Sequence, residues 1–358
     1  MKALITAGGR GTRLRPLTFT TNKHLVPIAN KPMIFYAIEK VRDAGITDIG
    51  IIINDGDNEL PPAIGDGSRW NAKITYIPQV GGALGLAHAV GAARDFIGEE
   101  SFLFYLGDNI ILADLSPFIE RFHSENLSAL LAFSKVKDPH RFGVPEFDGD
   151  RLVRVIEKPQ IPPSDFAVTG IYIYNSDVFQ AVDSIKPSAR GELEISDAHT
   201  WLLENDRPVG WEPITGWWKD TGKPEDLLDC NQFVLDRLGF AETDKNASIP
   251  ASAIIKGRVS IGKNSRIGDN VYIQGPAVIG DNASIENAYI GAYTSIGSNT
   301  VIKGTNIQNS IVFDGANINT DSVISDSLIG YNARITSAKD TLPKGHRLFV
   351  GDNSFIEL

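Results

Sequence analysis

A glycine-rich, basic segment near the start of the chain has residue types that suit phosphate groups. Residues 1–38 carry six basic side chains and no Asp or Glu, and residues 8–18 read GGRGTRLRPLT. Glycines let backbone N–H groups approach phosphate oxygens, and arginines add charge-assisted hydrogen bonds. The run lacks the Gly-Lys-Ser/Thr ending of a P-loop, and Leu14 stands where a dinucleotide fingerprint needs Gly or Ala. The segment predicts a local site for a small phosphate-bearing anion.

Two aspartates have contexts that suit a metal ion. Asp108 follows the apolar run 102–106 and a glycine, so it is predicted to project from the carboxyl end of a strand. Asp220 follows Trp-Trp-Lys and precedes a Thr-Gly turn. Two carboxylates with polyphosphate oxygens form a hard-oxygen site suited to Mg²⁺. On spacing alone, either aspartate could equally cap a turn.

Composition bounds the remaining possibilities. The 358 residues are 42% hydrophobic and 22% charged, which is ordinary for a globular protein of about two domains. A net charge of −10 disfavours a general nucleic-acid binder or a protein of anionic membrane surfaces. The single cysteine, Cys230, excludes an intrachain disulfide framework and a Cys-based zinc cluster. With no signal-peptide-like segment and no apolar stretch near ~18 residues, we expect a cytoplasmic protein.

The first ~235 residues alternate between strand-like and helix-like stretches. Helix-like patterns cover 33–44 and 85–96, among others. This alternation predicts an open, largely parallel α/β sheet with ligand sites at the carboxyl ends of its strands. The strand-like apolar runs are 3–6, 49–53, 74–77, 102–106, 129–133 and 170–174.

A six-residue rhythm replaces this pattern after about residue 245. Isoleucines recur every six residues from Ile255 to Ile285, and the rhythm continues with one-residue slips to Ile329. Gly, Asn and Asp recur between them, and these residues tolerate the positive φ of tight corners. A period of six predicts a parallel β-helix with three short sides per coil, giving four to five coils over 253–337.

Several longer runs together resemble one family. They include KHLVPIANKP from Lys23, YLGDN at 105–109, IEKP at 156–159, VTGIY at 168–172, RGELEISD at 190–197 and WKDTG at 218–222. With the glycine-rich loop, they resemble sugar-1-phosphate nucleotidylyltransferases, specifically the long form of glucose-1-phosphate thymidylyltransferases. The resemblance spans essentially the whole chain. It implies a Rossmann-like (GT-A-like) mixed-sheet catalytic domain over 1–235, a linker over 236–252, a left-handed parallel β-helix over 253–345 and a tail over 346–358.

The resemblance also implies a reaction and roles for its residues. A glucose 1-phosphate oxygen would attack the α-phosphorus of dTTP in line, with Mg²⁺ present, giving dTDP-glucose and pyrophosphate. Positioning and charge neutralisation then carry the catalysis. Catalytic roles fall to Arg13, Lys23, Asp108, Lys158 and Asp220, the two aspartates holding the metal. Nucleotide-binding roles fall to Gly8, Gly9, Gly11, Thr12, Arg13, Lys23, Gln79, Gly85, Leu86 and Asp108. Sugar-phosphate-binding roles fall to Gly143, Glu157, Lys158, Thr169, Tyr172 and Trp218.

The base preference stays open between dTTP and UTP. Gln79 and the segment Gly85-Leu86 match the family's base-recognising residues, and an amide can pair with the imide edge of thymine or uracil. The intervening loop is one residue longer than the family's usual loop. The two bases differ by one methyl group, which is worth roughly 1–3 kcal/mol in discrimination.

Other readings follow from the same features. A UTP- or GTP-dependent transferase forming UDP-glucose or GDP-mannose is the nearest alternative. A non-catalytic regulatory subunit is disfavoured because all five catalytic candidates are present. An acyltransferase is disfavoured because only His346 follows residue 240, and it lies beyond the regular repeats. The family implies deoxysugar supply, for rhamnose or a related glycan, and the repeats predict a homo-oligomer.

Overall fold

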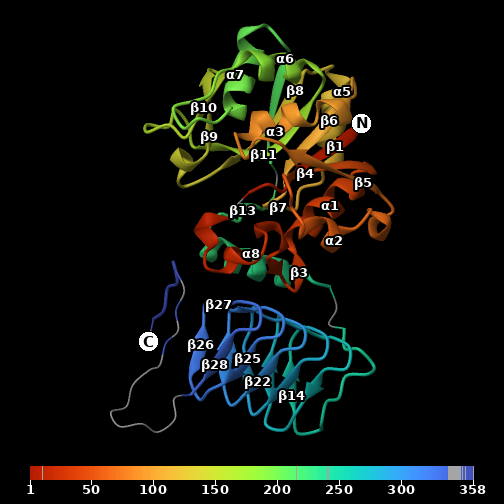
Figure 1. Ribbon diagram of the computed structural model, residues 1–358, viewed down its shortest axis with the longest axis vertical. Coiled ribbons are helices and arrows are strands. Elements are labelled where there is room, and N and C mark those ends of the chain that lie inside the picture. Colours follow the sequence, from red (N-terminus) through yellow and green to blue (C-terminus); the bar gives the residue numbers. More distant parts are fainter. Residues whose placement is uncertain are drawn as a thin grey trace. The chain divides into compact units, whose positions relative to one another are not determined.

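Two architectures make up the chain in the computed structural model (Figure 1), which describes residues 1–9, 11–214, 216–239, 242–337, 348, 350 and 352–357. They form two compact units. The first unit comprises Met1–Arg10, Asn22–Leu25 and Met33–Asp220. The second comprises Gly11–Thr21, Val26–Pro32 and Thr221–Leu358.

A seven-stranded mixed sheet is the centre of the first unit. Its order is β12-β8-β11-β6-β1-β4-β5. Strand β1 pairs in parallel with β4 and β6, β4 pairs in parallel with β5, and β11 runs antiparallel to both of its neighbours. This confirms the predicted α/β mixed sheet. The strands are β1 (Lys2–Thr6), β4 (Asp48–Asn54), β5 (Lys73–Gln79), β6 (Phe102–Leu106), β8 (Ala129–Lys135), β11 (Phe166–Tyr174) and β12 (Val209–Pro213).

Helices cover both faces of this sheet because its strands are apolar on both sides. In β1, Ala3 and Ile5 join one buried cluster, and Leu4 between them joins the other. Helices α1 (Met33–Asp43), α2 (Leu60–Ile64) and α5 (Ser116–Ser124) pack on the first cluster. Helices α3 (Leu86–Ala92), α4 (Arg94–Ile97), α6 (Asp177–Ser184) and α7 (Ile195–Glu204) pack on the second.

Short elements frame the ends of the strands. Strands β7 (Asn109–Ile111) and β13 (Trp218–Asp220) form an antiparallel pair, and β9 (Gly143–Asp148) and β10 (Arg151–Glu157) form a hairpin. In the second unit, β2 (Pro27–Ile28) pairs with β3 (Lys31–Pro32). The short 3₁₀ turns are Thr12–Leu14, Leu17–Phe19, Lys23–Leu25, Ser68–Trp70 and Pro139–Arg141.

Three five-stranded parallel sheets form the parallel β-helix that the six-residue period predicts. Each sheet has one inward row, and the rows at 255/273/290/307/324, 261/279/296/312/329 and 267/285/302/318/335 are all Ile or Val. The first sheet contains β14 (Ile254–Lys256), β17 (Tyr272–Gln274), β20 (Tyr289–Ile290), β23 (Asn306–Gln308) and β26 (Val323–Ser325). The second contains β15 (Val259–Ile261), β18 (Ala277–Ile279), β21 (Thr294–Ile296), β24 (Ile311–Val312) and β27 (Leu328–Ile329). The third contains β16 (Arg266–Ile267), β19 (Ser284–Glu286), β22 (Val301–Lys303), β25 (Asn317–Asn319) and β28 (Arg334–Thr336).

The corners of the β-helix explain its asparagines and the slips in its rhythm. Asn264, Asn282 and Asn299 all have φ between 55° and 58°, where asparagine is tolerated better than most residues. Their side chains hydrogen-bond one another from coil to coil. Ile255 pairs with Ile273, whereas Ile273 pairs with Ile290, so a coil shortened by one residue absorbs each slip.

Helix α8 (Pro224–Arg237) is fastened to the β-helix within the second unit by one buried amide. Asn231 is fully buried, and its Oδ1 accepts hydrogen bonds from the backbone N–H of Ala29 at 2.9 Å and from Ser295 Oγ at 2.6 Å. Its Nδ2 donates to the Tyr293 carbonyl at 2.9 Å. Because every partner is supplied, the burial of this amide is not penalised.

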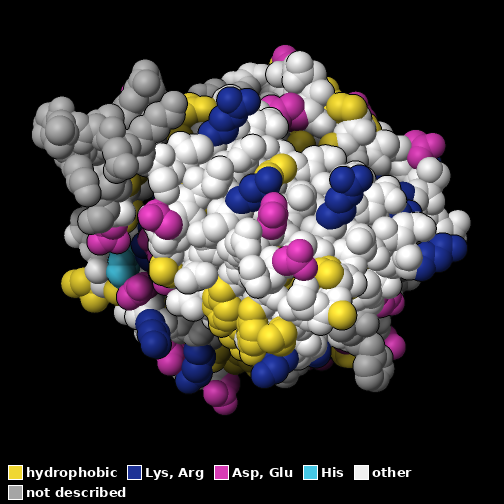
Figure 2. All heavy atoms as spheres, turned by 90° about the horizontal axis from the view of Figure 1, so that it is seen from below, with side chains coloured by type: hydrophobic (Ala, Val, Ile, Leu, Met, Phe, Trp, Pro, Cys, Tyr) yellow, Lys and Arg dark blue, Asp and Glu magenta, His cyan; other side chains and the backbone are white. Residues whose placement is uncertain are grey.

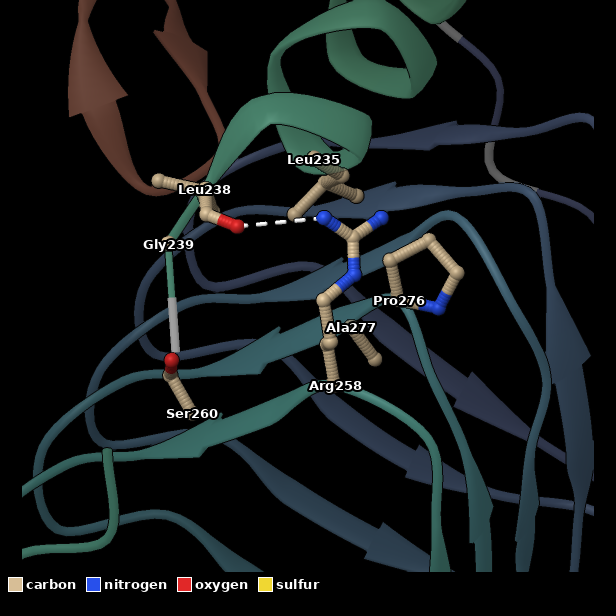
Figure 3. A pocket seen from close by; sticks show the side chains of 7 residues that line it. All are labelled: Leu235, Leu238, Gly239, Arg258, Ser260, Pro276 and Ala277. Atoms are coloured by element: carbon tan, nitrogen blue, oxygen red, sulfur yellow. Dashed lines mark hydrogen bonds between the residues drawn. The ribbon is translucent and has the colours of Figure 1, made fainter. Parts of the chain in front are cut away.

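A small cavity lies at the end of α8 (Figure 3). Arg258 lines it and donates from Nη1 to the carbonyl of Leu238 at 3.2 Å. Its volume of about 10 Å³ is no larger than one water needs, so it is not a substrate site. The other lining residues are Leu235, Gly239, Ser260, Pro276 and Ala277.

The surface on the β-helix side mixes both charge signs. Figure 2 shows Lys and Arg side chains interspersed with Asp and Glu, beside one gathered group of apolar side chains. Among the described residues, no helix is both long enough and apolar enough to cross a membrane.

The boundaries of the two compact units differ from the domain limits predicted from the sequence. Helix α8 and two N-terminal segments group with the repeats. Part of the expected linker adds to the β-helix, because Thr243 and Ser248 form bridges with Ile261 and Arg266. The predicted domain limits remain a proposal about sequence domains. Most of residues 338–358, including His346, lie outside the described residues.

One buried histidine predicts how stability depends on pH. His199 in α7 is fully buried, its Nε2 lies 2.6 Å from the Tyr174 hydroxyl, and its Nδ1 has no hydrogen-bond partner among the described residues. Burial lowers the pKa of His199 from 6.5 to about 3. Below pH 6.5, His199 therefore binds a proton in the unfolded chain, whereas in the folded chain it does not bind one until the pH falls to about 3.

We expect the stability from His199 to be complete above pH 6.5 and to be lost as pH falls toward 3. Between pH 7 and pH 5, His199 should lower the free energy of unfolding by roughly 2 kcal/mol. The free energy of unfolding in urea is measured for wild type and His199→Gln at both pH values. The contribution of His199 is the loss of this free energy in wild type minus the loss in the variant. Equal losses in the two proteins would show that His199 is not the responsible group.

Candidate active site

The predicted phosphate loop and metal residue lie at one edge of the sheet. Strands β1, β4, β5 and β6 are parallel, so the residues after Thr6, Ile53, Pro78 and Leu106 gather at their common carboxyl edge. Gly107 is required there, because a Cβ on it would lie 2.4 Å from the Thr6 carbonyl oxygen. The close approach lets the chain turn and present Asp108.

Lys23 and Asp108 form an ion pair at this edge. The Lys23 ammonium lies 2.6 Å from Asp108 Oδ2, and the side chains are only 9% and 25% exposed. Burial alone would raise the pKa of Asp108, but the Lys23 ammonium and hydrogen bonds outweigh it and bring the pKa below its usual value. Asp108 is therefore a carboxylate at neutral pH, and Lys23 supplies a buried positive charge beside it.

His24 adds a neutral ring next to this pair. It is 2% exposed, and a Cβ on Gly9 would lie 3.6 Å from its Cε1. Burial, with a contribution from Lys23, lowers the pKa of His24 to about 4, although Asp108 opposes the shift. The ring is consequently uncharged at neutral pH.

The second predicted metal ligand is brought to the same place by strand pairing. In the β7–β13 pair, Asp220 lies opposite Asn109, the residue that follows Asp108. Directly opposed residues in antiparallel strands have Cα atoms about 4.5–5.5 Å apart, so Asp220 lies close to Asn109, which is one residue along the chain from Asp108. The described residues contain no group of three or more His, Cys, Asp or Glu that could hold a metal. Two carboxylates are what a magnesium site completed by substrate phosphates and water requires.

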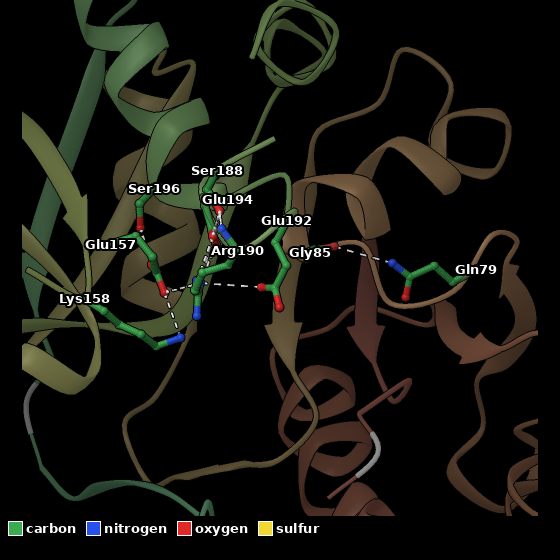
Figure 4. A network of polar contacts seen from close by, with 9 residues as sticks. All are labelled: Gln79, Gly85, Glu157, Lys158, Ser188, Arg190, Glu192, Glu194 and Ser196. Atoms are coloured by element: carbon green, nitrogen blue, oxygen red, sulfur yellow. Dashed lines mark hydrogen bonds and ion pairs between the residues drawn. The ribbon is translucent and has the colours of Figure 1, made fainter. Parts of the chain in front are cut away.

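Residues predicted for the sugar phosphate gather around Glu157 (Figure 4). Glu157 Oε1 lies 3.1 Å from Lys158 Nζ and 3.3 Å from Arg190 Nη2, and Oε2 accepts from Ser196 Oγ at 2.8 Å. Arg190 also bonds both oxygens of Glu194 at 2.8 Å. Burial, together with Glu194 and Glu157, raises the pKa of nearby Asp197. The two cations are thus held in a dense acidic network.

The backbone beside Glu157 has one sterically crowded position, Gly143, and one residue in an unusual conformation, Lys158. A Cβ on Gly143 would lie 2.7 Å from Ser196 Oγ and 3.4 Å from Glu157 Oε2, so a larger residue there would displace the Ser196 hydroxyl. Lys158 has φ of 44°, a left-handed conformation that is unfavourable for lysine, and it precedes a proline. Such outliers persist where the surroundings impose them, often at functional sites.

Thr169, Tyr172 and Trp218 hold the framework of this region. The Thr169 carbonyl accepts hydrogen bonds from Trp218 Nε1 at 2.8 Å and Asn109 Nδ2 at 3.0 Å, which joins β11 to the β7–β13 pair. The Thr169 hydroxyl donates to the Ala132 carbonyl. Tyr172 is 2% exposed and stacks with Phe104, so its ring is in the core. Their predicted contacts with sugar remain predictions.

Gln79, predicted to recognise the base, ends β5 at the same sheet edge. A Cβ on Gly8 would lie 3.4 Å from Gln79 Oε1, which places the phosphate loop and the amide side by side. Gly85 must be glycine, because a Cβ there would lie 2.3 Å from the Leu193 carbonyl oxygen. Leu86 begins α3 and packs on the core.

Gly11, Thr12 and Arg13 belong to the second compact unit. Gly11 has φ of 57° and begins the 3₁₀ turn, and Thr18 Oγ1 donates to the Gly11 carbonyl at 2.6 Å. Leu14 is buried, whereas Thr12 and Arg13 are exposed. The turn thus anchors its leucine and leaves the polar side chains accessible.

Sequence reasoning did not select several polar residues found at these positions. Arg190 and Ser196 lie inside the quoted 190–197 run. The charge of Arg190 and the hydroxyl of Ser196 were the sequence features that could have indicated a contact with Glu157. Asn54 ends an apolar strand, and its Oδ1 would lie 3.4 Å from a Cβ on Gly8. His88 is likewise not indicated by the sequence, because a lone histidine on a helix carries no spacing signal.

Comparison with known proteins extends these observations. A family model described as nucleotidyl transferase matches residues 2–237. A model of the bacterial transferase hexapeptide (six repeats) matches residues 258–287, and one described as GMPPB C-terminal domain matches residues 273–341. The two architectures therefore match separate families.

Individual relatives match over the full length. The chain is 44% identical over 361 residues to the low-salt glycan biosynthesis nucleotidyltransferase Agl11 of Haloferax volcanii, covering 100% of both chains. It is 41% identical to a glucose-1-phosphate thymidylyltransferase of Streptomyces griseus, covering 99% of this chain and 98% of that protein. A Bacillus anthracis protein solved with sucrose is 38% identical, with a TM-score of 0.62, covering 68% of this chain and 98% of that one.

Proposed function

The chain belongs to the nucleotidyl transferase family, and from that premise we propose that it transfers a thymidylyl group from dTTP to glucose 1-phosphate. The products are dTDP-glucose and pyrophosphate. Sugar-1-phosphate nucleotidyl transfer is the activity that its relatives support. The choice of thymidine and glucose is the proposal, supported by full-length similarity to a protein of that name.

The observation that carries the proposal is the Lys23–Asp108 pair at the carboxyl edge of the sheet. A buried ammonium beside an ionised carboxylate gives one group for phosphate oxygens and one for a metal. Asp220, opposite Asn109 in the strand register, adds the second carboxylate. A structural ion pair alone would not require a glycine-rich loop and a second acid at the same edge.

The proposed reaction needs no protein nucleophile. A phosphate oxygen of glucose 1-phosphate forms a bond to the α-phosphorus, and the bond from that phosphorus to the oxygen bridging the β-phosphorus breaks. Pyrophosphate leaves with the bonding electron pair. Lys23 and Arg13 offset charge on the triphosphate, Lys158 holds the sugar phosphate, and Glu157 accepts hydrogen bonds from sugar hydroxyls. Catalysis rests on orientation and charge stabilisation.

The donor set at the sheet edge fits magnesium. Asp108 is ionised, Asp220 lies opposite the next residue, Asn109, and hard carboxylate oxygens are what this ion prefers. When bound, Mg²⁺ would neutralise negative charge on the phosphate oxygens. Lys23 would remain beside Asp108 as the protein's own positive charge.

A substrate matrix tests the proposed function. Five nucleoside triphosphates are combined with the 1-phosphates of glucose, galactose, mannose and N-acetylglucosamine, and pyrophosphate release is measured with Mg²⁺. We expect the highest kcat/KM for dTTP with glucose 1-phosphate. The thymine methyl group should contribute roughly 5–150-fold of the preference over UTP, which also differs from dTTP by its 2′-hydroxyl. Higher kcat/KM for UTP or GTP would assign the alternative transferases.

Two further outcomes of the matrix would reject the activity itself. No pyrophosphate from any pair would favour a regulatory subunit. Turnover of acetyl-CoA without pyrophosphate release would favour an acyltransferase.

The setting of the activity is also proposed. A cytoplasmic location suits the single cysteine, Cys230, which is a buried thiol. Homo-oligomerisation is expected from the regular β-helix, whose flat sheets suit self-association. Native mass of the purified chain tests the second expectation.

A further inference from the structure

We infer that His88 makes the site reject cytosine nucleotides in favour of thymine or uracil nucleotides. It does so by fixing which end of the Gln79 amide faces the nucleotide. This inference rests on the proposed function, in which Gln79 reads the base. His88 would then be a positioning residue that acts through Gln79 and touches no reacting atom.

The contacts around Gln79 define its orientation. Gln79 Nε2 lies 2.9 Å from His88 Nδ1 and 3.5 Å from the Gly85 carbonyl oxygen. The carbonyl can only accept a hydrogen bond, and Nδ1 of a neutral histidine accepts when Nε2 carries the proton. The Gly85 carbonyl therefore requires the amide nitrogen rather than the oxygen, and His88 requires it too in the tautomer that has the proton on Nε2.

The amide oxygen is consequently turned the other way. Oε1 would lie 3.4 Å from a Cβ on Gly8, and no group among the described residues donates a hydrogen bond to it. Gln79 is only 4% exposed, so a rotated amide would leave a buried group badly paired. The glycine beside the oxygen leaves room for a ligand atom.

The orientation carries information about the base. An amide oxygen can accept from the N3–H of thymine or uracil. Cytosine has an unprotonated N3 at the same place, so the two lone pairs would face each other. An amide free to rotate would present its NH₂ group instead and could pair with cytosine. Fixing the amide therefore excludes cytosine without any contact between His88 and the nucleotide.

The position of His88 explains why it can do this. It lies in the first turn of α3, half-buried, nine residues after Gln79. The segment before the helix is pinned, because Leu193 N–H donates to the Leu84 carbonyl at 2.8 Å and Ala87 N–H donates to the Leu193 carbonyl at 3.1 Å. The histidine is thus held by a fixed backbone.

The test compares kcat/KM for dTTP and dCTP in three proteins. Wild type should favour dTTP strongly. His88→Leu removes the acceptor and should narrow the dTTP-to-dCTP ratio roughly 3- to 13-fold, as expected when one hydrogen bond is lost. His88→Asp places an acceptor oxygen where Nδ1 stands and should keep the ratio within about 2-fold of wild type. Any general charge effect on triphosphates cancels in the ratio.

Each result decides the inference. An unchanged ratio in His88→Leu, or a wild type that does not distinguish dTTP from dCTP, would overturn it. If His88→Leu fails to fold, His88→Lys serves instead, since lysine can reach solvent and offers only donors, and the same narrowing is expected. The KM for glucose 1-phosphate should not change in any variant. Absence of nucleotidyl transfer by wild type would instead reject the proposed function.

Discussion

Asp108→Asn should lower kcat by roughly 10²–10³-fold at saturating Mg²⁺, the scale found when one charge-stabilising group is removed from an active site. The carboxylate is ionised and paired with Lys23 at 2.6 Å, and the next residue along the chain, Asn109, lies opposite Asp220 in the β7–β13 register. Asparagine keeps an oxygen that can accept from Lys23 but loses the negative charge that a metal needs. Steady-state pyrophosphate release at several metal concentrations measures the loss.

The fold of this variant should be retained, because the amide oxygen keeps Lys23 hydrogen-bonded. Circular dichroism and thermal unfolding check this. Asp148→Asn is a matched control, since Asp148 is an exposed acid at the end of β9. It should leave kcat within about 2-fold of wild type. Turnover by Asp108→Asn equal to that of the control would remove Asp108 from the metal site.

Lys158→Ala should raise the KM for glucose 1-phosphate by roughly 10–100-fold and change the KM for dTTP far less. The loss of one charge-assisted hydrogen bond to phosphate, worth about 1.5–3 kcal/mol, gives this range. Lys158 lies 3.1 Å from Glu157, so its removal also leaves that carboxylate with Arg190 and Ser196 alone. Initial rates over both substrate concentrations separate the two KM values.

The backbone at this residue supplies an internal control. At φ of 44°, alanine has the same steric penalty as lysine, whereas glycine has none. Lys158→Gly should therefore lose sugar-phosphate affinity as Lys158→Ala does, while unfolding at a higher urea concentration than Lys158→Ala. Lys73→Ala, at an exposed position in β5, should change neither KM. Equal increases in both KM values for Lys158→Ala would contradict a role confined to the sugar phosphate.

Periodic patterns gave the fold reliably because they are repeated physical constraints. Each coil of the β-helix needs three inward aliphatic side chains, so Ile261, Ile279 and Ile296 stack in one row with the predicted spacing. The alternating apolar runs likewise predicted six of the seven strands of the mixed sheet, and they missed β12. The grouping of residues 11–21 and 26–32 with the repeats could not be predicted, since it depends on long-range contacts such as that between Asn231 and Ala29.

The site was partly predictable for a similar reason. Asp108 follows an apolar run, so the rule for parallel sheets predicted it at the carboxyl edge. Gln79 was indicated by the family resemblance alone. Asp220 reaches that edge through an antiparallel pair, which no local pattern announces. Arg190 contacts Glu157, which is 33 residues away in the sequence, and His88 contacts Gln79, which is 9 residues away. A single sequence contains no pattern that pairs such residues with each other.

The fate of the α-phosphate tests the central claim most directly. Purified protein is mixed with Mg²⁺, glucose 1-phosphate and dTTP labelled with ³²P at the α-phosphorus, and the products are separated. The account predicts that the label moves into a sugar nucleotide while unlabelled pyrophosphate is released in equal amount. Label that stays in dTTP, or that appears in dTMP without a sugar nucleotide, would contradict it.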